Sequence, residues 1–155
     1  MRHFLVLLSL VGACAGSPYD ACNLSWSGED PALGEIIFED GRRLVGGSYN
    51  HTIRNGRISA GTFTVNVRSD GADEPSFDDA LVVGLPVCRH LDRENDSILF
   101  NDSGGTWMTD ADHTGTLAIA SREGQELLGM VSAELVSTGG ETRHVRAAFR
   151  LGPSD

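Results

Sequence analysis

The sequence contains no lysine, and all 12 of its basic residues are arginine. This composition indicates a GC-rich bacterial genome; the alternative is selection for arginine side chains, which bind acidic groups bidentately. Acidic residues outnumber these basic ones, since 22 aspartates and glutamates give the chain a formal net charge of −10. An acidic chain has the wrong sign for general binding to nucleic-acid phosphates or for polybasic attraction to anionic lipids, so both classes are excluded.

Long apolar runs are also absent, since no stretch reaches the about 20 residues that a membrane-spanning helix needs. The short apolar run at residues 4–11 contains one polar residue, Ser9. It follows Arg2 and is followed by the small residues Gly12 and Ala13. A basic start, an apolar run and small residues are the order of a secretory signal, so we expect residues 1–13 to be a signal peptide.

Motifs of catalysis are missing too. The chain has no G-x-S-x-G nucleophile elbow, no H-E-x-x-H zinc motif and no glycine-rich phosphate loop. Its three cysteines, Cys14, Cys22 and Cys88, have neither C-x-x-C nor zinc-ribbon spacing. These absences favour a protein that is not an enzyme.

Short strands and turns dominate what is present. Phe63, Val65 and Val67 alternate with polar residues, which is the period of a half-buried antiparallel strand. Turn residues recur every eight to twelve positions, and 19 glycines fit many turns. We therefore predict one all-β domain over 34–155 with seven to nine strands and few or no helices: a small antiparallel β-sandwich or open barrel ending in a three-stranded meander.

The meander is predicted over 114–121, 125–137 and 141–151, because apolar residues alternate in each run. The predicted buried face contains Leu117, Ile119, Leu127, Val131, Ala133, Leu135, Val145, Ala147, Phe149 and Leu151. A short helix over 126–135 is the alternative, and Gly129 together with the alternation argues against it.

Four local expectations accompany this fold. Asp40-Gly41 and Asn55-Gly56 are dipeptides of type I′ hairpin turns. Residues 81–87 predict a short buried strand, and residues 101–115 a long loop. Two polar loops bring together Asp92, Glu94, Asp96 and Asp102, which would form an acidic rim if they shared an end of the domain with Asp110 and Asp112.

The residues Val11-Gly12-Ala13-Cys14 follow the apolar run directly. They resemble the lipobox of bacterial lipoproteins, and the resemblance covers residues 1–14 only. It implies cleavage before Cys14, a diacylglycerol on its sulfur, acylation of its amine (palmitate-type chains), and an N-terminal membrane anchor. Ala15 stands where aspartate favours inner-membrane retention, which implies the outer membrane, with the domain facing the periplasm or the surface. The alternative is ordinary cleavage after Ala15 and soluble secretion.

Both alternatives remove Cys14 from the folded domain. Cys22 and Cys88 then remain in an oxidising compartment, where a pair is expected to form a disulfide. Residues 14–33 are small, polar and proline-bearing, so we expect an anchor cysteine and a tether ahead of the domain.

Candidate contact residues are few. Asp110 and Asp112 precede Gly115 in a string that could offer oxygen ligands to Ca²⁺, and an Asx-type turn is the competing interpretation. Trp107 is the best single contact candidate, in a glycine-flanked segment. His144, Arg146 and Arg150 alternate with the buried residues of the last strand, with Arg143 close by, and form the only basic cluster. This face could meet a ligand, or it could protect an edge strand from pairing.

The sequence thus favours a non-enzymatic, envelope-anchored binding or structural module whose partner is an unknown protein or small ligand. The alternatives are a small metal-assisted hydrolase using Asp110, Asp112 and His113, or a secreted cation-binding protein. The N-x-S/T sequons at Asn23, Asn50, Asn95 and Asn101 would suggest glycosylation in a eukaryotic secreted protein, and they count against the bacterial assignment.

Overall fold

A computed structural model of the chain describes residues 22–52, 54–68, 75–92, 96–122 and 125–155. The predicted signal peptide (residues 1–13), Cys14, Glu94 and Asn95 lie outside the described residues. Among the described residues, no helix has the length and apolar composition required to cross a bilayer.

Eleven strands and one short π-helical turn make up the regular structure of the described residues. The strands are β1 (Glu35–Phe38), β2 (Arg43–Val45), β3 (Ser48–His51), β4 (Asn55–Ala60), β5 (Phe63–Arg68), β6 (Val87–Leu91), β7 (Ser97–Asp102), β8 (Gly105–Met108), β9 (Gly115–Arg122), β10 (Glu126–Ser137) and β11 (Thr142–Pro153). The helical turn is η2 (Asp79–Val83).

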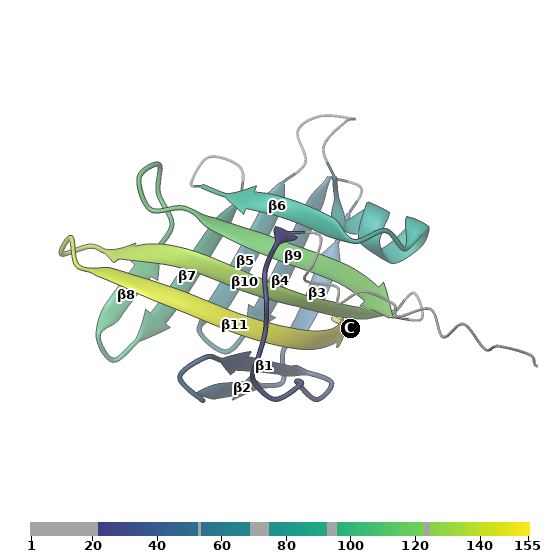
Figure 1. Ribbon diagram of the computed structural model, residues 1–155, viewed down its shortest axis with the longest axis horizontal. Helices are drawn as coiled ribbons and strands as arrows, with labels where there is room; N and C mark the ends of the chain where they lie inside the picture. The colour runs from purple at the N-terminus through teal and green to yellow at the C-terminus, as the bar shows by residue number, and fades with distance from the viewer. Residues whose placement is uncertain (1–21, 53, 69–74, 93–95, 123–124) are drawn as a thin grey trace, which may run out of the picture.

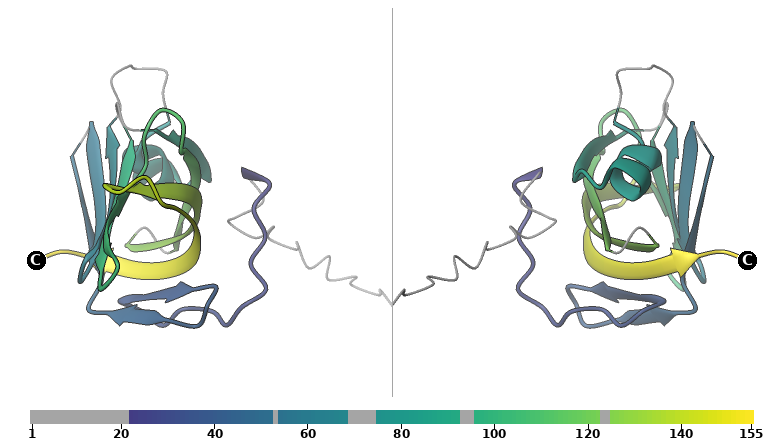
Figure 2. Two further views of the ribbon diagram at one scale, coloured as in Figure 1. Left: turned by 90° about the vertical axis from the view of Figure 1, so that its left-hand side faces the viewer. Right: turned by 90° about the vertical axis from the view of Figure 1, so that its right-hand side faces the viewer.

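The strands form two curved layers that are joined at two corners (Figures 1 and 2). One layer has the order β6-β9-β10-β11-β1-β2, and the other has the order β3-β4-β5-β7-β8. The layers connect where β10 pairs with β8, and where β11 pairs with β3 in parallel. The other pairings are antiparallel. The predicted all-β fold, a sandwich or open barrel, is therefore confirmed, but the sheet is mixed and not purely antiparallel because β11 and β3 run parallel.

The meander is confirmed. β9, β10 and β11 pair in sequence, with Leu117 opposite Val131 and Val131 opposite Ala147. The segment that could have been a helix lies in the 12-residue strand β10. All ten residues predicted for the buried face belong to the core.

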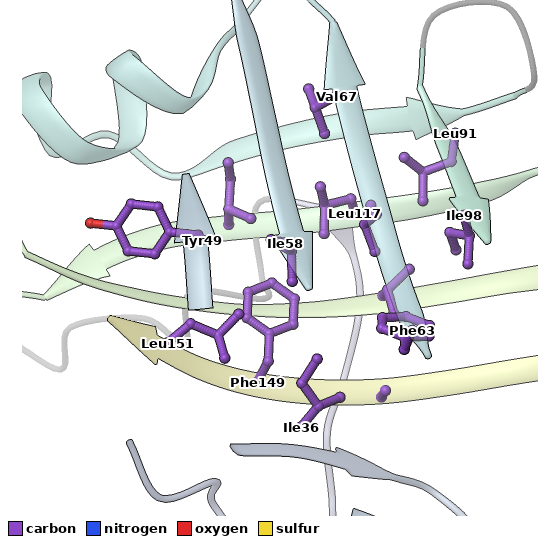
Figure 3. Packing of buried hydrophobic residues seen from close by; sticks show 14 of the residues in the cluster. Ile36, Tyr49, Ile58, Phe63, Val67, Leu91, Ile98, Leu117, Phe149 and Leu151 are labelled. Atoms are coloured by element: carbon purple, nitrogen blue, oxygen red, sulfur yellow. The ribbon is translucent and has the colours of Figure 1, made fainter. Parts of the chain in front are cut away.

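The core fills the space between the layers (Figure 3). Phe63 on β5 contacts Phe38 and Phe100 edge to face, with ring centroids 5.4 and 5.8 Å apart. Such aromatic pairs add stability beyond the area that they bury. The predicted alternation in β5 is confirmed, because Phe63, Val65 and Val67 are all buried.

The outer face of the meander is also covered, which the prediction of one buried face missed. Ala118, Met130 and Ala148 point away from the core in alternation with its members, yet all three are fully buried. Residues 22–34 run across this face in both views (Figures 1 and 2). The printed links of this segment to the face are at Cys22, which is bonded to Cys88, and at Ser25, whose carbonyl accepts a hydrogen bond from Arg146.

Both predicted hairpins are present, as β1–β2 and β3–β4, but their turns differ from the prediction in type or place. After β1, the Gly41 N–H bonds to the Phe38 carbonyl and the Phe38 N–H to the Arg42 carbonyl, which closes a three-residue loop. Gly41 has φ of 86°, whereas Asp40 has no positive φ, and a type I′ turn requires two. Asn55 and Gly56 lie inside β4, and the turn precedes them. Glycine is needed at position 56 because a Cβ there would clash with the Phe77 ring.

Residues 81–87 are not a buried strand. Leu81 belongs to η2, and β6 begins only at Val87. Gly84 has φ of 77° and ends the turn, a conformation that a strand does not use. An apolar run gives no period that separates a strand from a helical turn, so the sequence pattern was ambiguous here.

The predicted loop over 101–115 contains the end of β7, the turn of the β7–β8 hairpin and all of β8. Asp102 pairs with Gly105 across a two-residue turn, and Phe100 pairs with Trp107. β8 has only four residues, too few to show alternation in the sequence. Short strands such as β2 and β8 raise the count above the seven to nine expected.

Candidate binding cleft

Two arginines lie over aromatic rings at the end of the domain where β7, β8 and β11 meet. The Arg143 guanidinium carbon is 5.5 Å from the Phe100 ring centroid and 5.4 Å from that of Trp107. The Arg42 guanidinium carbon is 4.9 Å from the Phe38 centroid and 5.3 Å from that of Phe100. We call Arg42, Arg143, Phe38, Phe100 and Trp107 the arginine–aromatic cluster. Rings at this distance attract a cation and orient its plane.

Asp102 is the carboxylate that holds the cluster together. Its Oδ2 accepts a hydrogen bond from Arg143 at 2.5 Å and lies 3.8 Å from Arg42. Its Oδ1 accepts from the Trp107 indole N–H at 3.1 Å and from the Gly104 N–H at 2.9 Å. The Arg143 hydrogen bond holds the pKa of Asp102 below its ordinary value, with the Trp107 and Gly104 bonds acting in the same direction.

A cleft of about 230 Å³ opens beside this cluster, between the β1–β2 turn and the start of β11. Arg146 forms one side of it, bonding Glu39 at 2.6 Å and the Ser25 carbonyl at 2.6 Å. The cleft is lined by Phe38, Glu39, Asp40, Arg42, Arg143, His144, Val145 and Arg146. Three guanidinium groups from two distant segments thus meet at one opening in a strongly acidic protein.

The structure brings some of the predicted contact residues together and separates others. His144 and Arg146 line the cleft, and Trp107 lies beneath Arg143. Trp107 is only 8% exposed, so it supports an arginine and does not offer a free ring to solvent. Arg150 is apart from the cleft and pairs with Glu126 at 2.9 Å.

Arg143 does not share the outward face of His144. It alternates in step with the buried Val145, and its guanidinium therefore reaches the rings at the open end of the core. Arg42 was not identified from the sequence as part of a site, and Asp102 was assigned to an acidic rim and not to this cluster. The sequence did contain one indication: Arg143 occupies one of the alternating strand positions that point to the core.

The Asp110 string forms a turn. Asp110 Oδ1 accepts hydrogen bonds from the backbone N–H groups of Asp112 and His113, and it lies 2.8 Å from His113 Nδ1. This is the geometry of an Asx turn, with one carboxylate oxygen already occupied. Within the described ranges, no group of three or more His, Cys, Asp or Glu side chains is placed to hold a metal ion.

Asp96 and Asp102 do not assemble the acidic rim, because Asp96 immediately precedes β7 and Asp102 is its last residue. Asp96 is 2% exposed and accepts a hydrogen bond from Arg89 Nε at 2.7 Å. Its other oxygen accepts from the Arg68 N–H at 2.7 Å. Asp96 is therefore a buried structural group and not a surface ligand.

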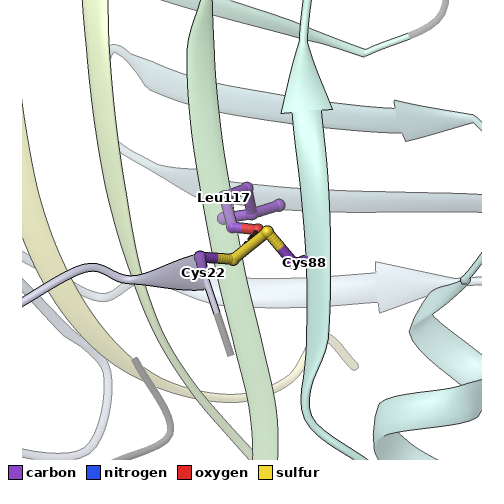
Figure 4. The surroundings of a disulfide bond; sticks show 3 residues. All are labelled: Cys22, Cys88 and Leu117. Carbon is purple, nitrogen blue, oxygen red and sulfur yellow. Dashed lines mark hydrogen bonds between the residues drawn. A yellow bond between two sulfur atoms is a disulfide. The ribbon is translucent and has the colours of Figure 1, made fainter. Parts of the chain in front are cut away.

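Cys22 and Cys88 form a disulfide, as predicted (Figure 4). Their Cα atoms are 5.3 Å apart, and the bond joins residues 66 positions apart in sequence. Cys88 alternates with the inward Val87 and Arg89 on β6, so its sulfur points to the outer face where the N-terminal segment lies. The segment is thus fixed at Cys22 by the disulfide and at Ser25 by Arg146.

Comparisons with known proteins add no relative. No family model matches the chain, and searches of curated proteins and of solved structures find no match.

The chemistry of the cleft suits binding. An arginine guanidinium stays charged at all physiological pH values, so it donates hydrogen bonds without exchanging a proton. Guanidinium groups fixed over rings and carboxylates lose little conformational freedom when they bind. Each of the three guanidinium groups already pairs with a carboxylate of the domain: Arg42 with Asp40, Arg143 with Asp102 and Arg146 with Glu39. A ligand with oxygen acceptors would therefore bind by sharing or displacing these pairs.

We expect Asp102→Asn to lower the melting temperature at neutral pH. In acid, the difference in melting temperature between the wild type and the variant should become smaller. The folded state lowers the Asp102 pKa from 3.8, so its carboxylate stabilises the fold above that value. This contribution is lost as pH falls through the lowered pKa. Thermal melts of both proteins between about pH 2 and 7 test this. Asp30→Asn, on an exposed segment, is the control, and a wild-type-minus-variant difference that does not change with pH would contradict the assignment.

Proposed function

We propose that this chain is a non-enzymatic module of the bacterial cell envelope, anchored in the outer membrane by lipid on Cys14, that binds a partner at its arginine-lined cleft. The disulfide between Cys22 and Cys88 is the observation that supports export most directly. Disulfides form and persist in the periplasm and outside the cell, and they are rare in the cytosol.

The path of the N-terminal segment supports an anchored arrangement. Cys22 follows Cys14 by eight residues and is covalently fixed to β6. Three residues later, the Ser25 carbonyl accepts a hydrogen bond from Arg146, which lines the cleft. The segment that would leave the membrane therefore forms part of the support of the proposed binding site.

The partner of this proposal is a protein or a small ligand that carries carboxylates or similar oxygen acceptors. Arg42 and Arg143 share Asp102, and each also faces a ring. Arg143 and Arg146 belong to one strand and point to the two sides of it, so together they border the opening. An incoming carboxylate would find donors whose positions are already set.

We expect Cys14→Ser to abolish membrane association. With the native signal expressed in a Gram-negative host, the wild-type protein should enter the detergent phase with the outer membrane. Its mature mass should match cleavage before Cys14 plus two or three acyl chains. The variant should lose both properties, whereas Ser17→Ala keeps them as the matched control. A variant that still partitions with membranes would show the lipobox interpretation to be wrong, and a wild-type mass that fits cleavage after Ala15 would indicate soluble secretion.

A further inference from the structure

Three aliphatic side chains project into solvent just before β6. Val82 is 77% exposed, Val83 is 61% exposed and Leu85 is 58% exposed. We call these three residues the η2 tip. A contiguous group of exposed aliphatic residues on a folded protein marks a surface that meets another apolar phase or partner.

The tip is held in place by the other side of the same turn. Phe77, Ala80 and Leu81 are buried in the core. The Gly84 and Leu85 N–H groups both donate to the Asp79 carbonyl, which fixes the end of the turn. The buried residues of the turn account for its contact with the core. The exposed aliphatic residues gain nothing from facing water, because apolar surface is stabilised only when it is buried.

The disulfide places the tip close to the start of the domain. Leu85 precedes Cys88 by three residues, which limits their Cα separation to about 11 Å. Cys88 is bonded to Cys22, and the turn leads directly into β6 (Figures 1 and 4). The eight residues from Cys14 to Cys22 span at most about 29 Å, so lipid on Cys14 would hold Cys22 within that distance of the attachment point, which leaves this end of β6 within reach of the bilayer surface.

We infer that the η2 tip inserts into the lipid interface of the membrane to which the chain is anchored. The inference rests on the proposed lipid anchor. Asp78 and Asp79 closely precede the tip in the chain, so the contact depends on apolar burial and not on attraction to anionic headgroups. With Cys14 as one attachment and the tip as the second, the domain takes one orientation on the membrane.

A tryptophan reporter tests this contact in the mature, full-length protein. Leu85→Trp and Leu99→Trp each replace a partly exposed leucine, the first in the tip and the second on β7 in the other layer. Both proteins are bound to phosphatidylcholine vesicles, with and without brominated acyl chains, and the wild-type emission of Trp26 and Trp107 is subtracted. We expect the reporter at 85 to be quenched and blue-shifted, and the reporter at 99 to be unchanged. Adding Val82→Ser and Val83→Ser should remove the quenching at 85.

The outcomes separate the tip from the anchor. Equal quenching at 85 and 99 in a protein whose mass shows acyl chains overturns the tip and leaves the anchor intact. If the mass shows no acyl chains, the proposed lipid anchor is wrong. The quenching measurement with excess lipid then still tests whether the η2 tip enters the lipid interface. Concentration-dependent dimerisation in ultracentrifugation that Val83→Asp abolishes would assign the tip to a second copy of the chain and overturn the inference.

Discussion

Asp96→Ala is expected to lower the free energy of unfolding by about 3–5 kcal/mol, since it removes one partner of a buried ion pair. Arg89 is 7% exposed and Asp96 is 2% exposed. Their contact joins β6 to the start of β7, while Arg89 also donates to the Pro75 carbonyl at 2.8 Å and the Arg68 carbonyl at 3.0 Å. The variant would leave the guanidinium charge in the interior without this carboxylate.

Chemical unfolding followed by fluorescence and circular dichroism measures this effect. Arg89→Met with Asp96→Leu removes both charges and fills the space, so we expect the double variant to recover most of the loss. Glu29→Ala breaks the exposed pair with Arg43 and should cost no more than about 1 kcal/mol. If Asp96→Ala were no more harmful than Glu29→Ala, the pair would not contribute to the stability of the core.

The strands that could be predicted were those with a clear period of two. β5 and the meander each bury every second residue over at least six positions, and this periodic burial is visible in the sequence. The disulfide followed from chemistry, because removing Cys14 left only Cys22 and Cys88. The alternation along a strand, and the pairing of two cysteines in an oxidising compartment, can both be predicted without knowing which distant residues are in contact.

The arginine–aromatic cluster and the buried ion pair could not be predicted in the same way. Asp96 and Asp102 both stand in polar stretches that read as solvated loops, and their partners lie 7 and 41 residues away. Only tertiary structure brings such partners together. The alternation of side chains along β6 did give one indication, because Arg89 shares the inward positions of the strand with Val87 and Leu91. A charged residue at an inward position requires a buried partner, which was the clue to Asp96.

The turn dipeptides gave a wrong prediction for a related reason, because the role of a glycine can depend on a residue that is distant in the sequence. Asn55-Gly56 matches a hairpin turn locally, but Gly56 is needed where the Phe77 ring crosses β4. A glycine selected for close approach and a glycine selected for a positive φ look alike in sequence. The choice between them depends on Phe77, which lies 21 positions further along the chain.

Removing the disulfide is the second change with a large expected effect. We expect Cys22→Ser with Cys88→Ser to lower the free energy of unfolding by about 4 kcal/mol, from the loop entropy of the 66-residue separation in the unfolded chain. The double variant avoids leaving one thiol that could pair with Cys14. The folded state also loses the fixed start of the segment that lies over Ala118, Met130 and Ala148.

Reduction gives an independent measurement of the same bond. Wild-type protein in dithiothreitol should unfold at the denaturant concentration of the double variant, and the reductant should not affect that variant further. Cys14→Ser is the matched control and should unfold as the oxidised wild type does, because both interpretations of Cys14 place it outside the folded domain. Trp26 is half-buried on the N-terminal segment, so its emission should move toward that of exposed tryptophan when the bond is absent. If reduction changed neither unfolding nor Trp26 emission, the bond would be dispensable for holding the segment, and the support that Ser25 gives Arg146 would have to come from packing alone.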